Sequence, residues 1–267
     1  MVQRLLFLGL VVLPFILIGL PVQFLILWAN LPGWRVLPLV FFKLLAFGLG
    51  LRVQVAGMPV RNGPVLLVAN HIGWLDIVAV ASKFPVSFVA KSEIARWPIV
   101  GFMARLQKTI FVDRKRRTDT GRTAREMSGR IVEGTSVLLF AEGTSDIGTH
   151  VLPFRSALMG AASAAMAEGA DKPVMIQPLA IAYTAISGLP LSRNERRQVA
   201  WIGDMDIADN LGAILSSGPK DVTLALGAPL PANGDRKAMA KAAEMEVRQM
   251  LNALNRGQPL PSARTLV

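Results

Sequence analysis

The chain of 267 residues contains no cysteine, which excludes disulfides, zinc–thiolate sites and thiol nucleophiles. It has a single tyrosine and only two histidines. With so little tyrosine and with scattered phenylalanines, the chain has no aromatic platform among its charges for stacking bases, so nucleic-acid binding is a poor fit. The scarcity of histidine makes His71, which stands where chemistry tends to occur, an informative residue.

Acidic residues are also scarce. Eighteen Asp and Glu oppose 29 Lys and Arg, which gives a formal net charge of +11, and 52% of the residues are hydrophobic. A chain that is both basic and very apolar is typical of a protein that meets an anionic membrane surface. Its length fits one catalytic domain with an appendage.

The first part of the chain differs in kind from the rest. Leu5 to Trp28 is almost entirely apolar and long enough to span a bilayer core of about 30 Å. A shorter apolar run, Val36 to Leu51, follows a Pro32-Gly33 turn signal and carries Lys43. A cleaved signal peptide is the alternative, but the first run is too long and lacks a clean cleavage site. We therefore expect residues 1–52 to form a membrane-embedded helical hairpin with both ends cytoplasmic.

From Val53 onward, short apolar runs alternate with helical patterns. Strands are expected at Val53–Ala56, Val65–Ala69, Val86–Ala90, Thr109–Val112, Ser136–Phe140, Val174–Tyr183, Val199–Ile202 and Val222–Leu226. Helices are expected at Ile77–Ser82, Pro98–Leu106, Thr118–Val132, Ser156–Ala167, Ile207–Leu215 and Arg236–Leu254. This alternation predicts an α/β domain over residues 53–256, with a largely parallel central sheet flanked by helices, and a loose tail at 257–267.

His71 and Asp76 stand between an expected buried strand and the next helix. In open α/β sheets, the carboxyl edge of the strands is where ligands bind. A carboxylate five residues after a histidine can accept the Nδ1–H of the imidazole, which leaves Nε2 free to take a proton from a hydroxyl. The pair therefore suggests a general base with its orienting acid. The alternative is that Asp76 caps the following helix and His71 is an ordinary loop residue.

Three further segments support the first interpretation. The strand at 109–112 runs into a basic cluster, where Arg114 is suited to bind an anionic group. The turn Glu142-Gly143-Thr144 follows another strand, and it suits hydrogen bonding to a polar headgroup or to an oxyanion, although a plain turn is the alternative. The strand with Pro178 is suited to line an acyl pocket, or it is a bulged core strand.

Together these segments resemble the glycerolipid acyltransferase family, whose familiar member is 1-acylglycerol-3-phosphate acyltransferase. Its NHxxxxD, FVDR, EGT and proline-bearing blocks occur in order at 70–76, 111–114, 142–144 and 176–183. The resemblance implies that His71 is the general base and Asp76 its orienting acid. It also implies that Arg114, Glu142, Gly143 and Thr144 bind the acceptor lipid, and that Lys91 binds an anionic group.

One departure from the family bears on the acceptor. The family usually has arginine after its EGT block, whereas Ser145 and Asp146 follow here. An acid repels a phosphate dianion. The FAEGTSD form, together with the LPFRSAL segment that contains Arg155, is more similar to the branch that acylates lyso-ornithine lipid. That acceptor carries an ammonium and a carboxylate. We therefore expect Ser145, Asp146 and Arg155 to lie in the acceptor site.

The expected function is O-acyl transfer from an acyl-carrier-protein or acyl-CoA thioester to a lysolipid hydroxyl. The expected acceptor is lyso-ornithine lipid. The resemblance implies no metal and no cofactor beyond the thioester. The expected partners are membrane lipids and the acyl donor, and the expected location is the inner (cytoplasmic) membrane, with the active site on the cytoplasmic face. The alternatives are a phosphatidic-acid-forming enzyme, a lipid hydrolase that activates water with the same base, and a catalytically silent lipid-binding protein.

Overall fold

The structure is a computed structural model that describes residues 1–61, 63–113, 117–203, 205 and 207–261. Its strands are β1 Leu51–Ala56, β2 Val65–Ala69, β3 Ser87–Lys91, β4 Ile110–Val112, β5 Val137–Phe140, β6 Met175–Ile186, β7 Leu189–Pro190, β8 Lys220–Leu226 and β9 Leu230–Pro231. Its α-helices are α1 Val2–Phe7, α2 Leu13–Trp28, α3 Val36–Leu49, α4 Trp74–Ala81, α5 Pro98–Leu106, α6 Arg117–Val132, α7 Gly160–Ala167, α8 Arg193–Val199, α9 Ile207–Ser216 and α10 Arg236–Asn255.

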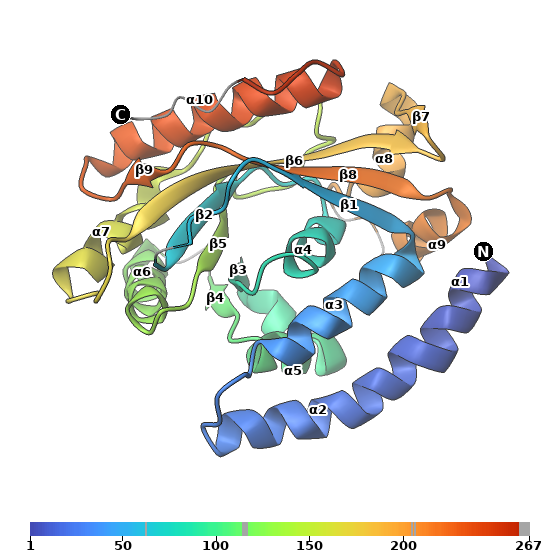
Figure 1. Cartoon of the computed structure of the whole chain (residues 1–267), viewed down its shortest axis with the longest axis horizontal. Coiled ribbons are helices and arrows are strands. Elements are labelled where there is room, and N and C mark those ends of the chain that lie inside the picture. The colour runs from blue at the N-terminus through green and yellow to red at the C-terminus, as the bar shows by residue number, and fades with distance from the viewer. Residues whose placement is uncertain (62, 114–116, 204, 206, 262–267) are drawn as a thin grey trace.

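The described strands form one mixed sheet, whose main path has the order β1-β8-β6-β2-β5-β3-β4 (Figure 1). The five strands from β6 to β4 are parallel. The direction reverses only between β6 and β8, and β1 then pairs parallel to β8, while the short β7 and β9 pair antiparallel to β6. The expected α/β fold with a mostly parallel sheet is therefore confirmed.

Helices cover both faces of the sheet because the strands bury side chains on both sides. Within β2, Leu66 and Val68 face a core shared with α6, α7 and α10. Val65, Leu67 and Ala69 alternate with them and face a second core shared with α3, α4 and α9. In Figure 1, α10 accordingly lies above the sheet and α3 and α4 lie below it.

One expected strand is wrong. Residues 199–202 do not pair with the sheet: Val199 ends α8, a helix that the sequence analysis missed. Ser192 caps this helix, and its hydroxyl accepts a hydrogen bond from the Glu195 amide. A short apolar run does not by itself distinguish a strand from a helix end, and here the Trp201 amide bonds to the Ile72 carbonyl instead of to a strand.

The N-terminal segment forms the expected helical hairpin. A continuous rod, Val2–Trp28, includes a π-helical turn at Leu8–Val12 and is long and apolar enough to cross a membrane. After the turn at residues 29–35, α3 returns along the rod, which lies outermost in Figure 1. The first strand then begins at Leu51, so the hairpin joins the α/β domain without a linker.

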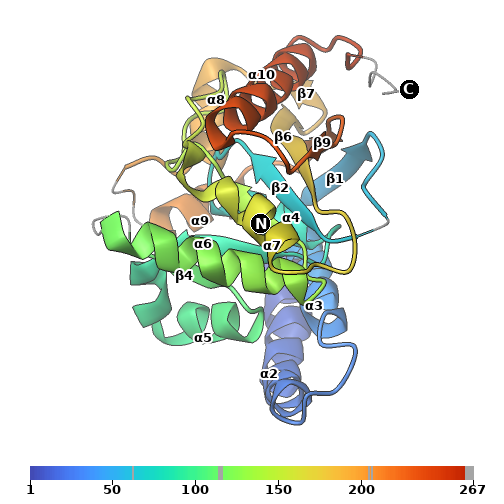
Figure 2. The ribbon, with the colours of Figure 1, turned by 90° about the vertical axis from the view of Figure 1, so that its left-hand side faces the viewer.

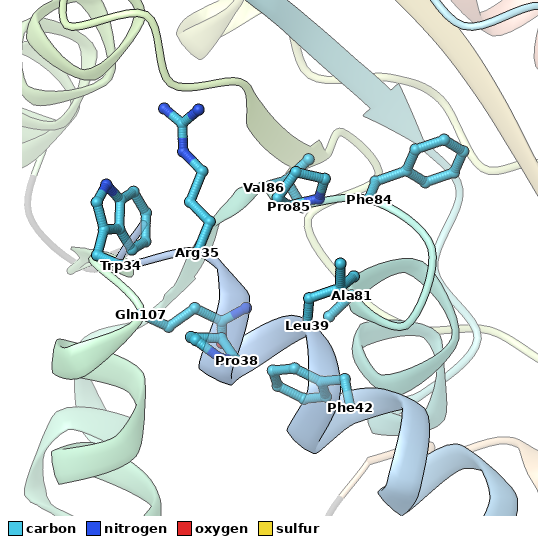
Figure 3. Close-up of a pocket in the computed structure, with 10 residues that line it drawn as sticks. All are labelled: Trp34, Arg35, Pro38, Leu39, Phe42, Ala81, Phe84, Pro85, Val86 and Gln107. Atoms are coloured by element: carbon cyan, nitrogen blue, oxygen red, sulfur yellow. The ribbon is translucent and has the colours of Figure 1, made fainter. Parts of the chain in front are cut away.

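The hairpin is held against the α/β domain near both ends of the rod. At one end, the Arg4 guanidinium donates to the Ser217 carbonyl just beyond α9, at 2.6 Å. At the other, the buried Gln23 donates to the Leu106 carbonyl at the end of α5, at 3.4 Å, as well as to the Trp34 carbonyl within the hairpin turn, at 2.8 Å. Figure 3 shows the crevice where the start of α3 meets the segment after α4. Its free space is about 10 Å³, which is too little for a lipid chain, so the crevice is a packed joint.

Candidate functional site

His71 stands directly beyond the carboxyl end of β2, at the middle of the sheet. The preceding residue, Asn70, is buried and holds the backbone where the chain leaves β2. Its side-chain amide donates to the Ile181 carbonyl at 3.0 Å and accepts from the Ile181 amide at 2.8 Å. Asn70 therefore extends the pairing of β2 with β6 by one residue through its side chain. The histidine is thereby placed on rigid backbone.

Asp76 holds both the histidine and the loop. Its Oδ2 lies 2.9 Å from His71 Nδ1 and accepts the amides of Ile72 at 2.6 Å and Gly73 at 3.0 Å. The carboxylate is fully buried in the first turn of α4. One carboxylate therefore both caps the helix and contacts the imidazole.

The imidazole is left with one nitrogen available. Its ring stacks on the Phe140 ring, with centroids 4.0 Å apart and planes 21° apart. Among the described residues, none hydrogen-bonds Nε2, and a fifth of the side chain is exposed. A neutral imidazole with Nδ1–H directed at Asp76 can accept a proton at Nε2. This geometry suits a general base.

Tyr183 is a site residue that the sequence analysis missed, having treated it only as the end of a strand. It is fully buried on β6, and its hydroxyl donates to Asp76 Oδ1 at 2.9 Å. Burial and the neighbouring Asp76 charge raise its pKa well above the ordinary value of 10, so the hydroxyl stays protonated and remains a donor. Its being the only tyrosine was the available signal, but no motif spacing connects it to Asp76.

Glu142 binds the backbone of the His71 loop. Its Oε2 accepts the His71 amide at 2.7 Å and its Oε1 accepts the Leu152 amide at 2.7 Å. The side chain is only 3% exposed. Both oxygens are therefore already engaged, and Glu142 joins the loop after β2 to the segment that follows β5.

Glu142→Gln tests this role through stability. The amide nitrogen faces one of the two backbone donors, and leaving that donor without an acceptor should lower the free energy of unfolding by about 1–3 kcal/mol. Burial raises the pKa of Glu142 from its ordinary 4.5 to about 7. The contribution of Glu142 to the free energy of unfolding is therefore full below its unfolded pKa and is lost as the pH rises through about 7.

The difference between wild type and Glu142→Gln should accordingly be larger at about pH 5 than at about pH 8, measured by chemical denaturation. Glu133→Gln, at an exposed position after α6, is the matched control. Equal unfolding curves for Glu142→Gln and wild type would show that Glu142 does not hold the loop.

Gly143, in the turn after β5, lies against the side chain of Arg155. Gly143 has a φ of +72°, and a Cβ added there would lie 2.7 Å from Arg155 Nε, so glycine is required for the approach. Thr144 is exposed next to them. Lys91 is exposed at the carboxyl end of β3, which runs parallel to β5 and so ends at the same edge of the sheet.

Ser145 and Asp146 differ in what they contact. Ser145 donates through its hydroxyl to the Trp201 carbonyl. The Asp146 amide donates to the His71 carbonyl at 2.9 Å, and its carboxylate lies 3.6 Å from the exposed His150 ring. The backbone of Asp146 is thus held against the His71 loop, and its side chain is directed to His150.

Gly73 allows the segment after α8 to approach the His71 loop. A Cβ at Gly73 would lie 3.0 Å from the Trp201 amide and 3.2 Å from the Val199 carbonyl. The residues wrongly expected to form a strand therefore pack on this loop.

Pro178 lies inside the sheet, where β6 stops pairing with β9 and starts pairing with β8. Its carbonyl accepts the Gly227 amide at 2.9 Å, and the side chain of the adjacent Gln177 bonds the Met58 and Gly227 carbonyls across this break. A residue without an N–H fits such an interruption. A role in an acyl pocket stays a prediction, and Arg114 lies outside the described residues.

A larger hollow, of about 420 Å³, opens at the other edge of the sheet. Its lining includes Pro64, just before β2, and Gly134, just after α6. Because His71 follows the opposite end of β2, this hollow is remote from the dyad and we assign it no part in the site.

Comparisons with known proteins place the chain in a family. A family model described as Acyltransferase matches residues 52–182. A lyso-ornithine lipid O-acyltransferase of Brucella abortus is 41% identical over 247 residues, which cover 91% of this chain and 92% of that protein. A protein of the same description from Rhizobium meliloti is 37% identical over 250 residues, with 93% and 86% covered.

A solved structure shares the fold. The 1-acyl-sn-glycerophosphate acyltransferase PlsC of Thermotoga maritima is 20% identical, with a TM-score of 0.61 and coverage of 95% of this chain and 96% of that one. At that identity the likeness extends to the fold alone. On the strength of the near-complete matches to its relatives, the chain belongs to the acyltransferase family and is an enzyme that transfers acyl groups.

Proposed function

We propose that the enzyme moves a fatty acyl group from a thioester to a lysolipid hydroxyl, with His71 as general base and Asp76 as its orienting acid. The observation that carries the proposal is the dyad itself, with Nδ1 2.9 Å from Asp76 and Nε2 unengaged by the described residues. Nε2 takes the hydroxyl proton as the oxygen attacks the thioester carbonyl, and the same proton passes to the departing thiolate. An ester bond forms and the thioester C–S bond breaks. The donor is an acyl-carrier-protein or coenzyme A thioester.

The proposed acceptor is lyso-ornithine lipid. Two relatives that match nearly the whole chain are described as lyso-ornithine lipid O-acyltransferases. Asp146 supports this choice, because its backbone amide is bonded to the His71 carbonyl and its carboxylate, whose closest cationic neighbour is the His150 ring at 3.6 Å, accepts no hydrogen bond at Oδ2 from the described residues. An acid there attracts an ammonium headgroup and repels a phosphate.

A competition experiment tests the acceptor. Purified enzyme with a labelled acyl thioester and equal amounts of lyso-ornithine lipid and lysophosphatidate should form mostly ornithine lipid. Asp146→Asn removes the charge at constant size and should narrow the preference for lyso-ornithine lipid. Asp171→Asn, the same change at an exposed position beside the remote hollow, should leave that preference unchanged. Because Ser145 already holds the Trp201 carbonyl, Asp146 is the cleaner position to change. A wild-type preference for lysophosphatidate would replace this acceptor with the phosphatidic-acid-forming alternative.

Tyr183→Phe tests whether Tyr183 positions Asp76. The change removes one donor to a buried carboxylate, a hydrogen bond of the kind worth about 1.5–3 kcal/mol, and we expect kcat to fall about tenfold. Asp76 should then hold the imidazolium more strongly, which moves the kcat/KM profile to higher pH. Thr184→Ala deletes a hydroxyl on the same strand and is the control. A lower rate with an unmoved pH profile would assign Tyr183 a purely structural role.

We further propose that the hairpin seats the enzyme in the cytoplasmic membrane, with the dyad on the cytoplasmic side, where acyl thioesters are made. Support comes from the rod Val2–Trp28, whose apolar side chains are mostly exposed. Leaving such a surface in water is unfavourable, and a bilayer covers it.

A further inference from the structure

α5 contributes to neither hydrophobic core. Only Gly101 and Leu106 of its nine residues are buried, and among the described residues none from this helix joins the core on either face of the sheet. Gly101 packs on the carbonyl of Ala95, where an added Cβ would lie at 2.5 Å. A helix with so little core contact is not explained by the packing of the domain.

The exposed side of α5 is apolar. Ile99, Val100 and Phe102 are 67%, 46% and 39% exposed. At 100° per residue, Ile99 lies on the opposite side of the helix from Gly101. Phe102, three residues after Ile99, lies next to Ile99 on that side. We call these three residues the α5 apolar surface. Exposed apolar residues that gather in this way mark an interaction site.

The α5 apolar surface is continuous with the hairpin. α5 contacts α2, and the buried Gln23 of α2 also reaches the Leu106 carbonyl at the end of α5. Figure 2 shows α5 beside the hairpin and below α6. At the other end of α5, the ring of its N-cap residue, Trp97, lies 6.4 Å from the ring of Trp201, whose amide bonds the Ile72 carbonyl beside the dyad. α5 therefore lies between the hairpin and the catalytic loop.

The charges around α5 suit an anionic lipid surface. Residues 92–108 contain three cations, Arg96, Arg105 and Lys108, against one acid, Glu93. Lys108 Nζ lies 4.7 Å from the centre of the Trp34 ring, at the turn of the hairpin. A short helix with apolar side chains, flanking cations and neighbouring tryptophans is typical of segments that lie in the bilayer interface.

We infer that α5 is a second membrane-binding element, which lies in the bilayer interface through Ile99, Val100 and Phe102 and holds the catalytic loop at the lipid surface. This goes beyond the proposed function, because no step of acyl transfer requires α5. A bilayer is favoured over an acidic carrier protein because the exposed residues are apolar and continue the apolar hairpin. An acidic partner would need cations at the centre of the contact.

The absence of cysteine provides the test. Ile99→Cys and Phe102→Cys each introduce the only thiol of the full-length chain, which a water-sensitive fluorophore then labels. Leu25→Cys on α2 reports the hairpin. Met245→Cys, whose side chain on α10 is 51% exposed, between the values for Ile99 and Phe102, is the control. Circular dichroism checks that each variant is folded. Vesicles contain equal phosphatidylcholine and phosphatidylglycerol, with and without spin-labelled quencher lipid.

We expect the probes at 99, 102 and 25 to shift to shorter emission wavelength and to be quenched by the labelled lipid, with no change at 245. If the α5 probes stay in water while the probe at 25 inserts, the inference is overturned and membrane seating by the hairpin stands. If the probe at 25 also stays in water, the proposal that the hairpin seats the enzyme in the membrane is overturned as well. A response of the α5 probes to acyl carrier protein without vesicles would make α5 a protein-docking surface and overturn the lipid assignment.

Discussion

His71→Ala should abolish most acyl transfer while leaving the fold intact. A general base contributes about 10²- to 10⁴-fold to the rate. The fold should survive because Asp76 keeps the Ile72 and Gly73 amides and the Tyr183 hydroxyl. The measurement is release of free thiol from the acyl donor in the presence of the lysolipid.

The second histidine of the chain is the control for this variant. His150 is 62% exposed in its side chain and has no part in the dyad, so His150→Ala should keep nearly full activity. Normal turnover by a well-folded His71→Ala protein would exclude His71 as the base. Thiol release by wild-type enzyme without any acceptor would favour the hydrolase alternative instead.

Asp76→Asn should reduce turnover, and the loss of about 10⁴-fold for the corresponding change in a Ser-His-Asp triad is its upper limit, because that loss includes a wrong imidazole tautomer. Here the amide oxygen can keep the three N–H donors on one side, while the amide nitrogen donates to the Tyr183 oxygen. The loop should therefore hold its shape, and the loss should fall on kcat because the imidazolium no longer has a carboxylate beside it.

The comparison of Asp76→Asn with Asp76→Ala separates the two roles of this residue. The alanine variant also removes the cap of α4 and leaves buried amides without acceptors, so it should lose stability as well as activity. If the asparagine variant unfolds as readily as the alanine variant, capping is the dominant role of Asp76. If it turns over substrate at the wild-type rate, the carboxylate charge is not needed for the reaction.

Most of the architecture followed from local sequence. Val65–Ala69 is an uninterrupted apolar run between Pro64 and Asn70, and it forms a strand buried on both faces as expected. The helix over Pro98–Leu106 also has the expected bounds, because proline at its first position and the basic Arg105 in its last turn are local signals. The apolar rod at the N-terminus is likewise visible from composition alone.

The contacts that the sequence did not reveal join residues far apart in the chain. Residues 199–202 form no strand because the Trp201 amide bonds Ile72 and its carbonyl accepts from Ser145. Glu142, which the family resemblance assigns to the acceptor lipid, has both carboxylate oxygens on backbone amides. Neither relation has a periodicity or spacing that a linear pattern can reveal.

The sequence by itself determined which groups are the candidates for the chemistry. With no cysteine and two histidines, the ordered blocks at 70–76 and 142–144 leave few candidates for a base and its partner. Tertiary structure decided how those groups are held. Tyr183, 107 residues after Asp76, reaches the same carboxylate because β6 and β2 are neighbouring parallel strands. Such contacts depend on which strands are neighbours in the sheet, and the separation of residues along the sequence does not encode that order.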